Sequence, residues 1–115
     1  MPNMYDRIKK ALAPLKIPVY PFFYGGKDSA YIVIHNLSDH PAQSADNTEI
    51  ITGYYLQIDF VAKRDMRATA DKAMPLLESA GFRRAARHEE YDQPSGTYRV
   101  CVRFTTYEEV YQPCH

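Results

Sequence analysis

Residues 54–60 read YYLQIDF and residues 98–104 read YRVCVRF, and these two runs decide the fold class. In each run apolar side chains occur at every second position, with polar residues between them, which is the period of a β-strand with one buried face. A helical segment closed by Ala80-Gly81-Phe82 separates the runs. The sequence therefore predicts an α+β domain. The intervening residues are expected to form a sheet face that is exposed or covered by another copy: Tyr55, Gln57, Asp59, Arg99 and Arg103.

The N-terminal residues predict an amphipathic helix from Asn3 to about Ala13. Asn3 is a suitable N-cap, and Pro14 and Pro18 end the helix because proline cannot donate a backbone hydrogen bond. The apolar residues that recur at helical spacing are Met4, Ile8, Ala11, Leu12 and Leu15.

A second helix is expected after Lys63-Arg64-Asp65. Gly81 suits the position just beyond its C-terminus, and Phe82 suits the apolar contact that often accompanies such a cap. Pro75 lies inside the helix, so we expect a kink or a restart there. The apolar stripe consists of Ala70, Ala73, Met74, Leu77 and Ala80.

Five strands are expected. In chain order they span Val19–Phe23, Ala30–Leu37, Glu49–Ala62, Phe82–Tyr91 and Thr97–Tyr107. Pro21 places the first strand at a sheet edge, and its charges place the fourth close to an edge. The third strand is long, so we expect either a bulge near Thr52-Gly53 or a strand that projects beyond the sheet. Residues Asp92–Gly96 are expected to form a turn, and Glu108–His115 a short tail.

The polar segment from Asn36 to Asn47 predicts a long loop. Loops of this length in compact domains usually carry function or are disordered. Because strands lie on both sides, we expect a hairpin whose tip extends as an arm. The arm residues expected to contact another subunit or a partner are Asp39, His40, Gln43 and Asp46.

Together these elements predict a single domain over residues 1–115, in the order helix, three strands, helix, two strands. Short links favour antiparallel neighbours, and a crossover through the second helix can place a later strand beside an earlier one. The expected architecture is a mixed or antiparallel sheet of about five strands. Both helices lie on one face of it, and a long β-hairpin projects from it.

The composition argues against several classes of partner. Fourteen basic and fourteen acidic residues cancel, so no net charge draws the protein to nucleic acid, an anionic membrane or an acidic substrate. The longest apolar run, Ala30–Ile34, is far shorter than the roughly 20 residues that cross a bilayer. Cys101 and Cys114 match no metal-binding or redox spacing, so we expect free thiols. These features predict a soluble protein made in a reducing cytoplasm.

Candidate catalytic, cofactor and metal sites are weak. Gly25-Gly26 lacks the Gly-Lys-Ser/Thr that completes a phosphate-binding loop. One potential set of metal ligands, without a fourth ligand at a fixed spacing, is His35, Asp39 and His40. The last hairpin could bring His88 and Glu89 to Cys101, but no group that would lower the pKa of the thiol is visible. We therefore expect no catalytic residue, cofactor or metal.

Arginine and tyrosine side chains gather in the last two strands, where they could grip nucleic acid. Acidic residues among them cancel much of the positive potential, which favours a salt-bridged sheet face or a subunit contact. A small nucleic-acid or peptide binding module remains the alternative function. The residues concerned are Arg83, Arg84, Arg87, Arg99 and Arg103, with Tyr91 and Tyr98.

Four parts of the chain carry a family resemblance: Ile34–Ile50, Tyr54–Val61, Leu77–Arg84, and Tyr91–Val100. They resemble the small tail proteins of long-tailed bacteriophages, in particular the tail terminator, tail completion or head-tail joining group. The resemblance covers most of the chain and consists of strand and helix patterns with few fixed residues. Pro75 is a departure from the pattern.

The resemblance implies an α+β sandwich and a structural role without catalysis. Six copies in such a family form a ring that caps the tail tube and presents a surface to the head connector. The implied partners are other copies of the chain, the tail tube protein, the head connector protein and DNA that passes through the ring. The implied location is the virion tail, after synthesis in the cytoplasm of a bacterial host.

Overall fold

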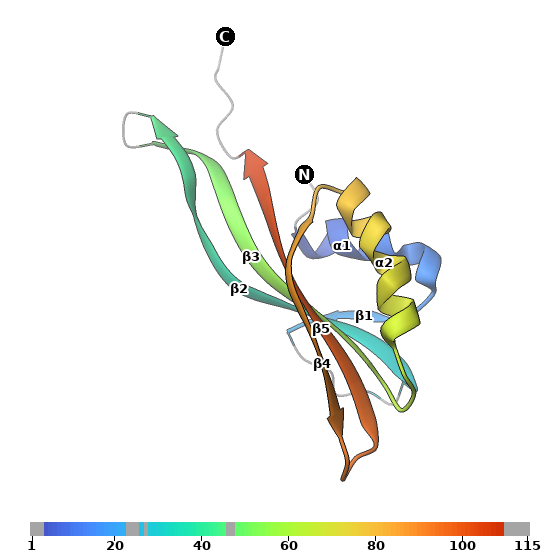
Figure 1. The fold of residues 1–115 in the computed structure, drawn as a ribbon. Helices are drawn as coiled ribbons and strands as arrows, with labels where there is room; N and C mark the ends of the chain where they lie inside the picture. The colour runs from blue at the N-terminus through green and yellow to red at the C-terminus, as the bar shows by residue number, and fades with distance from the viewer. Residues whose placement is uncertain (1–3, 23–25, 27, 46–47, 110–115) are drawn as a thin grey trace.

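A computed structural model describes residues 4–22, 26, 28–45 and 48–109, with the backbone alone over 41–45, 48–50 and 109. The protein is an α+β fold in which a five-stranded mixed sheet carries two helices on one face (Figure 1). Its elements are α1 (Met4–Leu12), the 3₁₀ helix η1 (Ala13–Leu15), β1 (Val19–Pro21), β2 (Ala30–Ala45), β3 (Thr48–Ala62), α2 (Arg67–Ser79), β4 (Arg83–Asp92) and β5 (Thr97–Glu109). The predicted fold class and order of elements are confirmed. Asn3, the expected N-cap, lies outside the described residues.

The strands lie in the order β1-β2-β3-β5-β4. β1 runs parallel to β2, and every other neighbouring pair is antiparallel. β4 therefore runs parallel to β3, and β5 returns between them to pair with both. The edge positions expected for the strand that contains Pro21 and for the charged strand β4 are confirmed.

One face of the sheet forms the hydrophobic core together with both helices. Alternate side chains of the strands point into this core, and the apolar faces of α1 and α2 cover it. Each large apolar side chain buried in this way contributes about 1.5–3 kcal/mol to stability. The largest fully buried core side chains include Ile8, Leu12, Leu56, Ile58, Phe60, Leu77, Phe82 and Phe104.

The C-terminus of α2 ends in the predicted glycine cap. Gly81 has φ +95°, and its backbone N–H donates to the carbonyl of Glu78 at 3.1 Å. The N–H of Phe82 donates to the carbonyl of Leu77 at 3.0 Å, which completes a Schellman motif. Phe82 is buried beneath the cap. The motif turns the chain directly from α2 into β4.

Arg7 of α1 holds this helix end in place. Its Nη2 donates to the carbonyl of Ala80 at 2.9 Å, and its guanidinium lies 4.9 Å from the centre of the Phe82 ring. A positive charge at a helix C-terminus interacts favourably with the helix dipole. Arg7 thus links α1 to the point where α2 ends.

α2 continues through Pro75 to Ser79, so the expected restart at this proline is wrong. Pro75 and Asp71 are both exposed. The carbonyl of Asp71 would accept the hydrogen bond that Pro75 cannot donate, and on this side of the helix water can replace it.

The predicted loop over Asn36–Asn47 is wrong for Asn36–Ala45, which belong to β2. These residues pair with β3, ending with Ala45 opposite Thr48, so the two strands project beyond the helices as the expected arm (Figure 1). Pairing with β3 satisfies the backbone hydrogen-bonding groups of these polar residues. Such residues have a low intrinsic preference for strands, but strand propensity depends strongly on context. The arm residues Asp46 and Asn47 lie outside the described residues.

Register shifts occur along the arm, one of them between Pro41 and Gln43, opposite Thr52 and Ile51. A bulge therefore lies close to the predicted place, but the extra residue belongs to β2 rather than to β3. The expected start of the tail at Glu108 is also wrong. Glu108 and Glu109 continue β5 and pair with Thr52 and Ile51 of β3.

We expect Gly81→Ala to lower the free energy of unfolding by about 1 kcal/mol, because a Cβ disfavours a positive φ. Gly81→Asn should lower the free energy of unfolding by less, since asparagine adopts a positive φ more readily than alanine does. Urea denaturation monitored by circular dichroism measures both, with Ser79→Ala in the preceding turn as a control. A Gly81→Ala protein as stable as the wild type would contradict the role of the cap.

Candidate interaction surface

The sheet face opposite the helices, which we call the open face, is organised around a buried carboxylate. Asp59 of β3 is 1% exposed. Gln57 Nε2 donates to Asp59 Oδ1 at 2.9 Å, and Arg99 Nη1 donates to Oδ2 at 3.3 Å. His35 Nε2 lies 3.1 Å from the same Oδ2. These four residues form the Asp59 cluster, which joins β2, β3 and β5.

The expectation that Asp59 is exposed is wrong, and its neighbours explain why. Val33 and Cys101 lie in register with it on the two flanking strands, and both are buried. The longer side chains of the Asp59 cluster surround these buried residues and exclude water from Asp59. A buried carboxylate requires hydrogen-bond donors to offset the loss of hydration, and the cluster supplies three.

Four of the residues expected to contact a subunit or a partner lie together on the open face. Gln57 is opposite Arg103, whose Nε donates to Gln57 Oε1 at 3.4 Å. Arg99 belongs to the Asp59 cluster, and Tyr55 is exposed at the end of the row that leads to the arm. The prediction that these side chains share one face is confirmed.

The remaining predicted contact residues belong to the arm. Asp39 and His40 are exposed in β2, and the ring of His40 lies so close to Gly53 that a Cβ there would come within 2.6 Å of it. Gln43 is in β2, but its side chain and the whole of Asp46 lie outside the described residues. The predicted contact residues therefore form two groups, one on the open face and one along the arm.

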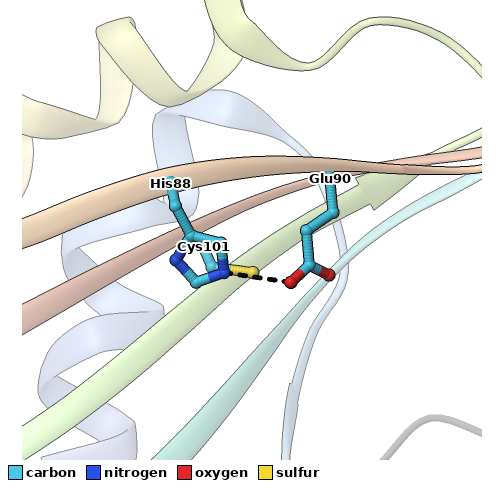
Figure 2. A group of neighbouring side chains, drawn as sticks. All are labelled: His88, Glu90 and Cys101. Carbon is cyan, nitrogen blue, oxygen red and sulfur yellow. Dashed lines mark hydrogen bonds and ion pairs between the residues drawn. The ribbon is translucent and has the colours of Figure 1, made fainter.

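Cys101 faces His88, as expected, but not Glu89. His88 is directly opposite Cys101 in the β4–β5 pairing, whereas Glu89 is opposite Val100, which belongs to the core. Glu90, two residues beyond His88, shares its face, and its Oε1 lies 3.1 Å from His88 Nε2 (Figure 2). Strand periodicity alone could have identified Glu90.

The environment of Cys101 opposes nucleophilic chemistry. Burial, and secondarily the neighbouring carboxylate of Asp59, raise the pKa of the Cys101 thiol to about 12. The reactive form of cysteine is the thiolate, which such a site disfavours at neutral pH. The surroundings of Cys101 therefore do not support the hypothesis of a thiol nucleophile at this position.

The arginines of the last two strands are divided between the two faces. Arg84 and Arg87 are opposite the core residues Phe104 and Val102, and Arg87 Nη1 donates to Asp71 Oδ1 of α2 at 2.6 Å. Arg99 and Arg103 are on the open face, where they bind Asp59 and Gln57. The single basic surface required by the nucleic-acid hypothesis is not formed by these residues.

A small groove lies on the helix side, between the start of α2 and the β4–β5 hairpin. Its volume is about 230 Å³, and its lining includes Met66, Glu89 and the tilted ring pair of Tyr91 and Tyr98, whose ring centres are 4.6 Å apart. This volume lies below the roughly 300–1,000 Å³ of ordinary small-molecule sites. The groove is therefore a shallow feature of the surface.

No family model and no curated protein matches the sequence. The fold is similar to that of a chain in the virion of a native gene transfer agent particle, with a TM-score of 0.57 and 15% sequence identity. The match covers 87% of this chain and 84% of that chain. At this identity the comparison establishes a shared fold. Over the described residues, neither helix combines the length and hydropathy needed to cross a membrane.

We expect Asp59→Ala to lower the free energy of unfolding by about 1–3 kcal/mol, because it removes the acceptor shared by three donors. The loss stays in this range because Gln57, His35 and Arg99 are partly exposed, so water can hydrate them. Thermal and urea denaturation measure the change. Arg103→Ala on the same face is the control and should change stability by less than about 0.5 kcal/mol. Equal stability of the Asp59→Ala and control proteins would contradict the central role of Asp59.

We expect Cys101 in the folded protein to react with iodoacetamide at pH 8 about 10³-fold more slowly than in urea, where its pKa returns to about 8.5. The experiment uses a Cys114→Ser variant, which leaves Cys101 as the one thiol, in the presence of EDTA. Because folding raises this pKa, its contribution to stability is complete below about pH 8.5 and is lost as the pH rises toward 12. Equal labelling rates in the folded and unfolded states would contradict the assignment.

Proposed function

We propose that the protein is a structural component of a phage or prophage virion and acts as a tail terminator or tail completion protein. The observation that carries this proposal is the fold similarity to a gene transfer agent virion chain, which extends over most of both chains. The sequence resemblance to small phage tail proteins supports the same class independently. The finer role, which is to cap the tail tube and join it to the head connector, rests on that resemblance.

The arm and the open face suit repeated contacts between copies. Among the described strands, β1 covers the outer side of β2 only at Ile32–Ile34, so His35–Ala45 form a free strand edge. β4 forms the free edge at the other side of the sheet. A molecule with unlike surfaces on opposite sides associates head to tail, and such contacts close into a ring when the rotation between copies allows it.

The proposed assembly is a ring of six copies, with the tail tube protein and the head connector protein as partners and DNA passing through the centre. Tyr55 and Tyr107 are exposed beside the root of the arm, at 39% and 63%. Tyrosine is enriched at protein interfaces because its ring supplies apolar area and its hydroxyl can bind at the rim. These side chains are suitable contacts between a copy and its neighbour.

We expect native mass spectrometry to show a concentration-dependent hexamer, and a variant without the arm to remain monomeric. The variant replaces residues 41–52 with Asn-Gly, which closes a two-residue hairpin turn. His40 and Gly53, which are opposite each other, then flank the turn. Circular dichroism checks that the fold is retained, and Gln93→Ala at the tip of the other hairpin serves as a control.

A tail terminator also binds the end of a tail tube. The wild-type protein should therefore bind tubes assembled from the tube protein encoded in the same genome, and electron microscopy would place it at the tube end. A protein that is monomeric at every concentration and also fails to bind these tubes would contradict the proposed function. A hexamer that persists without the arm would indicate that the copies contact one another through the open face instead of the arm.

A further inference from the structure

Three groups that commonly bind metal ions converge on the open face of the β4–β5 hairpin. Cys101 and His88 are directly opposite each other, and Glu90 follows His88 by two residues, so all three side chains emerge on one face. The nitrogen, oxygen and sulfur atoms that could bind a metal lie within 4.8 Å of one another. Figure 2 shows the three side chains directed toward one another. The antiparallel register of β4 and β5 therefore fixes the backbone positions of these three residues relative to one another.

We propose that His88 Nε2, a carboxylate oxygen of Glu90 and Cys101 Sγ form a zinc-binding site on this face. The fourth position of the ion is left for water or for a group from a neighbouring molecule. This inference concerns residues that the proposed function does not use, and it stands independently of it.

The spacing fits a tetrahedral ion after small movements. Zinc binds nitrogen and oxygen at about 2.0–2.2 Å and sulfur at about 2.3 Å, so its ligand atoms lie about 3.3–3.6 Å from one another. His88 Nε2 and Glu90 Oε1 are already 3.1 Å apart. Their side chains are 51% and 57% exposed and can rotate, while Cys101 is buried in the strand and fixes the position of the sulfur.

The combination of ligands selects the type of metal. Thiolate and imidazole favour zinc over magnesium and calcium, which prefer oxygen ligands throughout. Zinc binding must displace the proton of the Cys101 thiol, which leaves to solvent as the Zn–S bond forms.

The surroundings of the proposed site hold both signs of charge: Arg99 is opposite Glu90, and Asp59 is opposite Cys101. Two carboxylates and a thiolate together outweigh the one guanidinium and suit a divalent cation.

The test uses Co²⁺ in place of Zn²⁺, because cobalt reports its ligands by absorption. The chain carries the substitutions Cys114→Ser and His115→Ala, which remove a second thiol and imidazole that could bind metal on their own. One Co²⁺ per chain should bind with a thiolate-to-cobalt charge-transfer band in the near ultraviolet, and Zn²⁺ should displace it. Cys101→Ala should abolish the band.

Variants of the exposed ligands keep the test valid if Cys101→Ala fails to fold. His88→Ala and Glu90→Ala should each lower the affinity at least about tenfold, since even loss of an indirect partner of a metal ligand has that effect. The matched controls are Glu89→Ala on the opposite face and His40→Ala on the arm, which should leave the affinity unchanged. Three outcomes would overturn the proposal: no binding of Co²⁺ or Zn²⁺, binding without the charge-transfer band, or an affinity that His88→Ala and Glu90→Ala leave unaltered.

Discussion

The structure depends on β3, a strand whose two faces are both buried over its central part. One face carries Leu56, Ile58 and Phe60 into the core beneath the helices, and the other carries Asp59 and Val61, which are 1% exposed. β3 is hydrogen-bonded to β2 on one side and to β5 on the other. Because a shift of one residue would exchange its two faces, the apolar face and the buried carboxylate both determine the register.

The same strand produces the arm. On the N-terminal side of Leu56, β3 runs past the helices together with β2, and the two strands continue as a hairpin. The end of β5 pairs with β3 along one side of it (Figure 1). Here backbone pairing continues from strand to strand, ending with Ala45 opposite Thr48. A ladder of this kind presents free backbone groups along its edge, which is suited to binding another chain and is a liability when left exposed. The arm is thus the part of the fold best suited to pairing with another chain.

The open face combines a buried charge with a polar surface. Hydrogen bonds from side chains of three strands converge on Asp59, which places these side chains at defined positions around it. A polar surface of fixed geometry is suited to specific contacts and, at the hairpin, to a metal ion. The similarity to a gene transfer agent virion chain concerns the fold, and a shared fold does not by itself fix what these surfaces bind.

The sequence by itself determined the elements with strong periodicity. The alternation in β3 and β5, the stripe of α2 and the glycine at its end were all predictable, because each signal lies within a few residues of the chain. The tertiary structure alone decided two features: that polar Asn36–Ala45 form a strand, and that Asp59 is buried. Each depends on which residue of a distant strand lies opposite, and that register is set by pairing across the whole sheet rather than by local sequence.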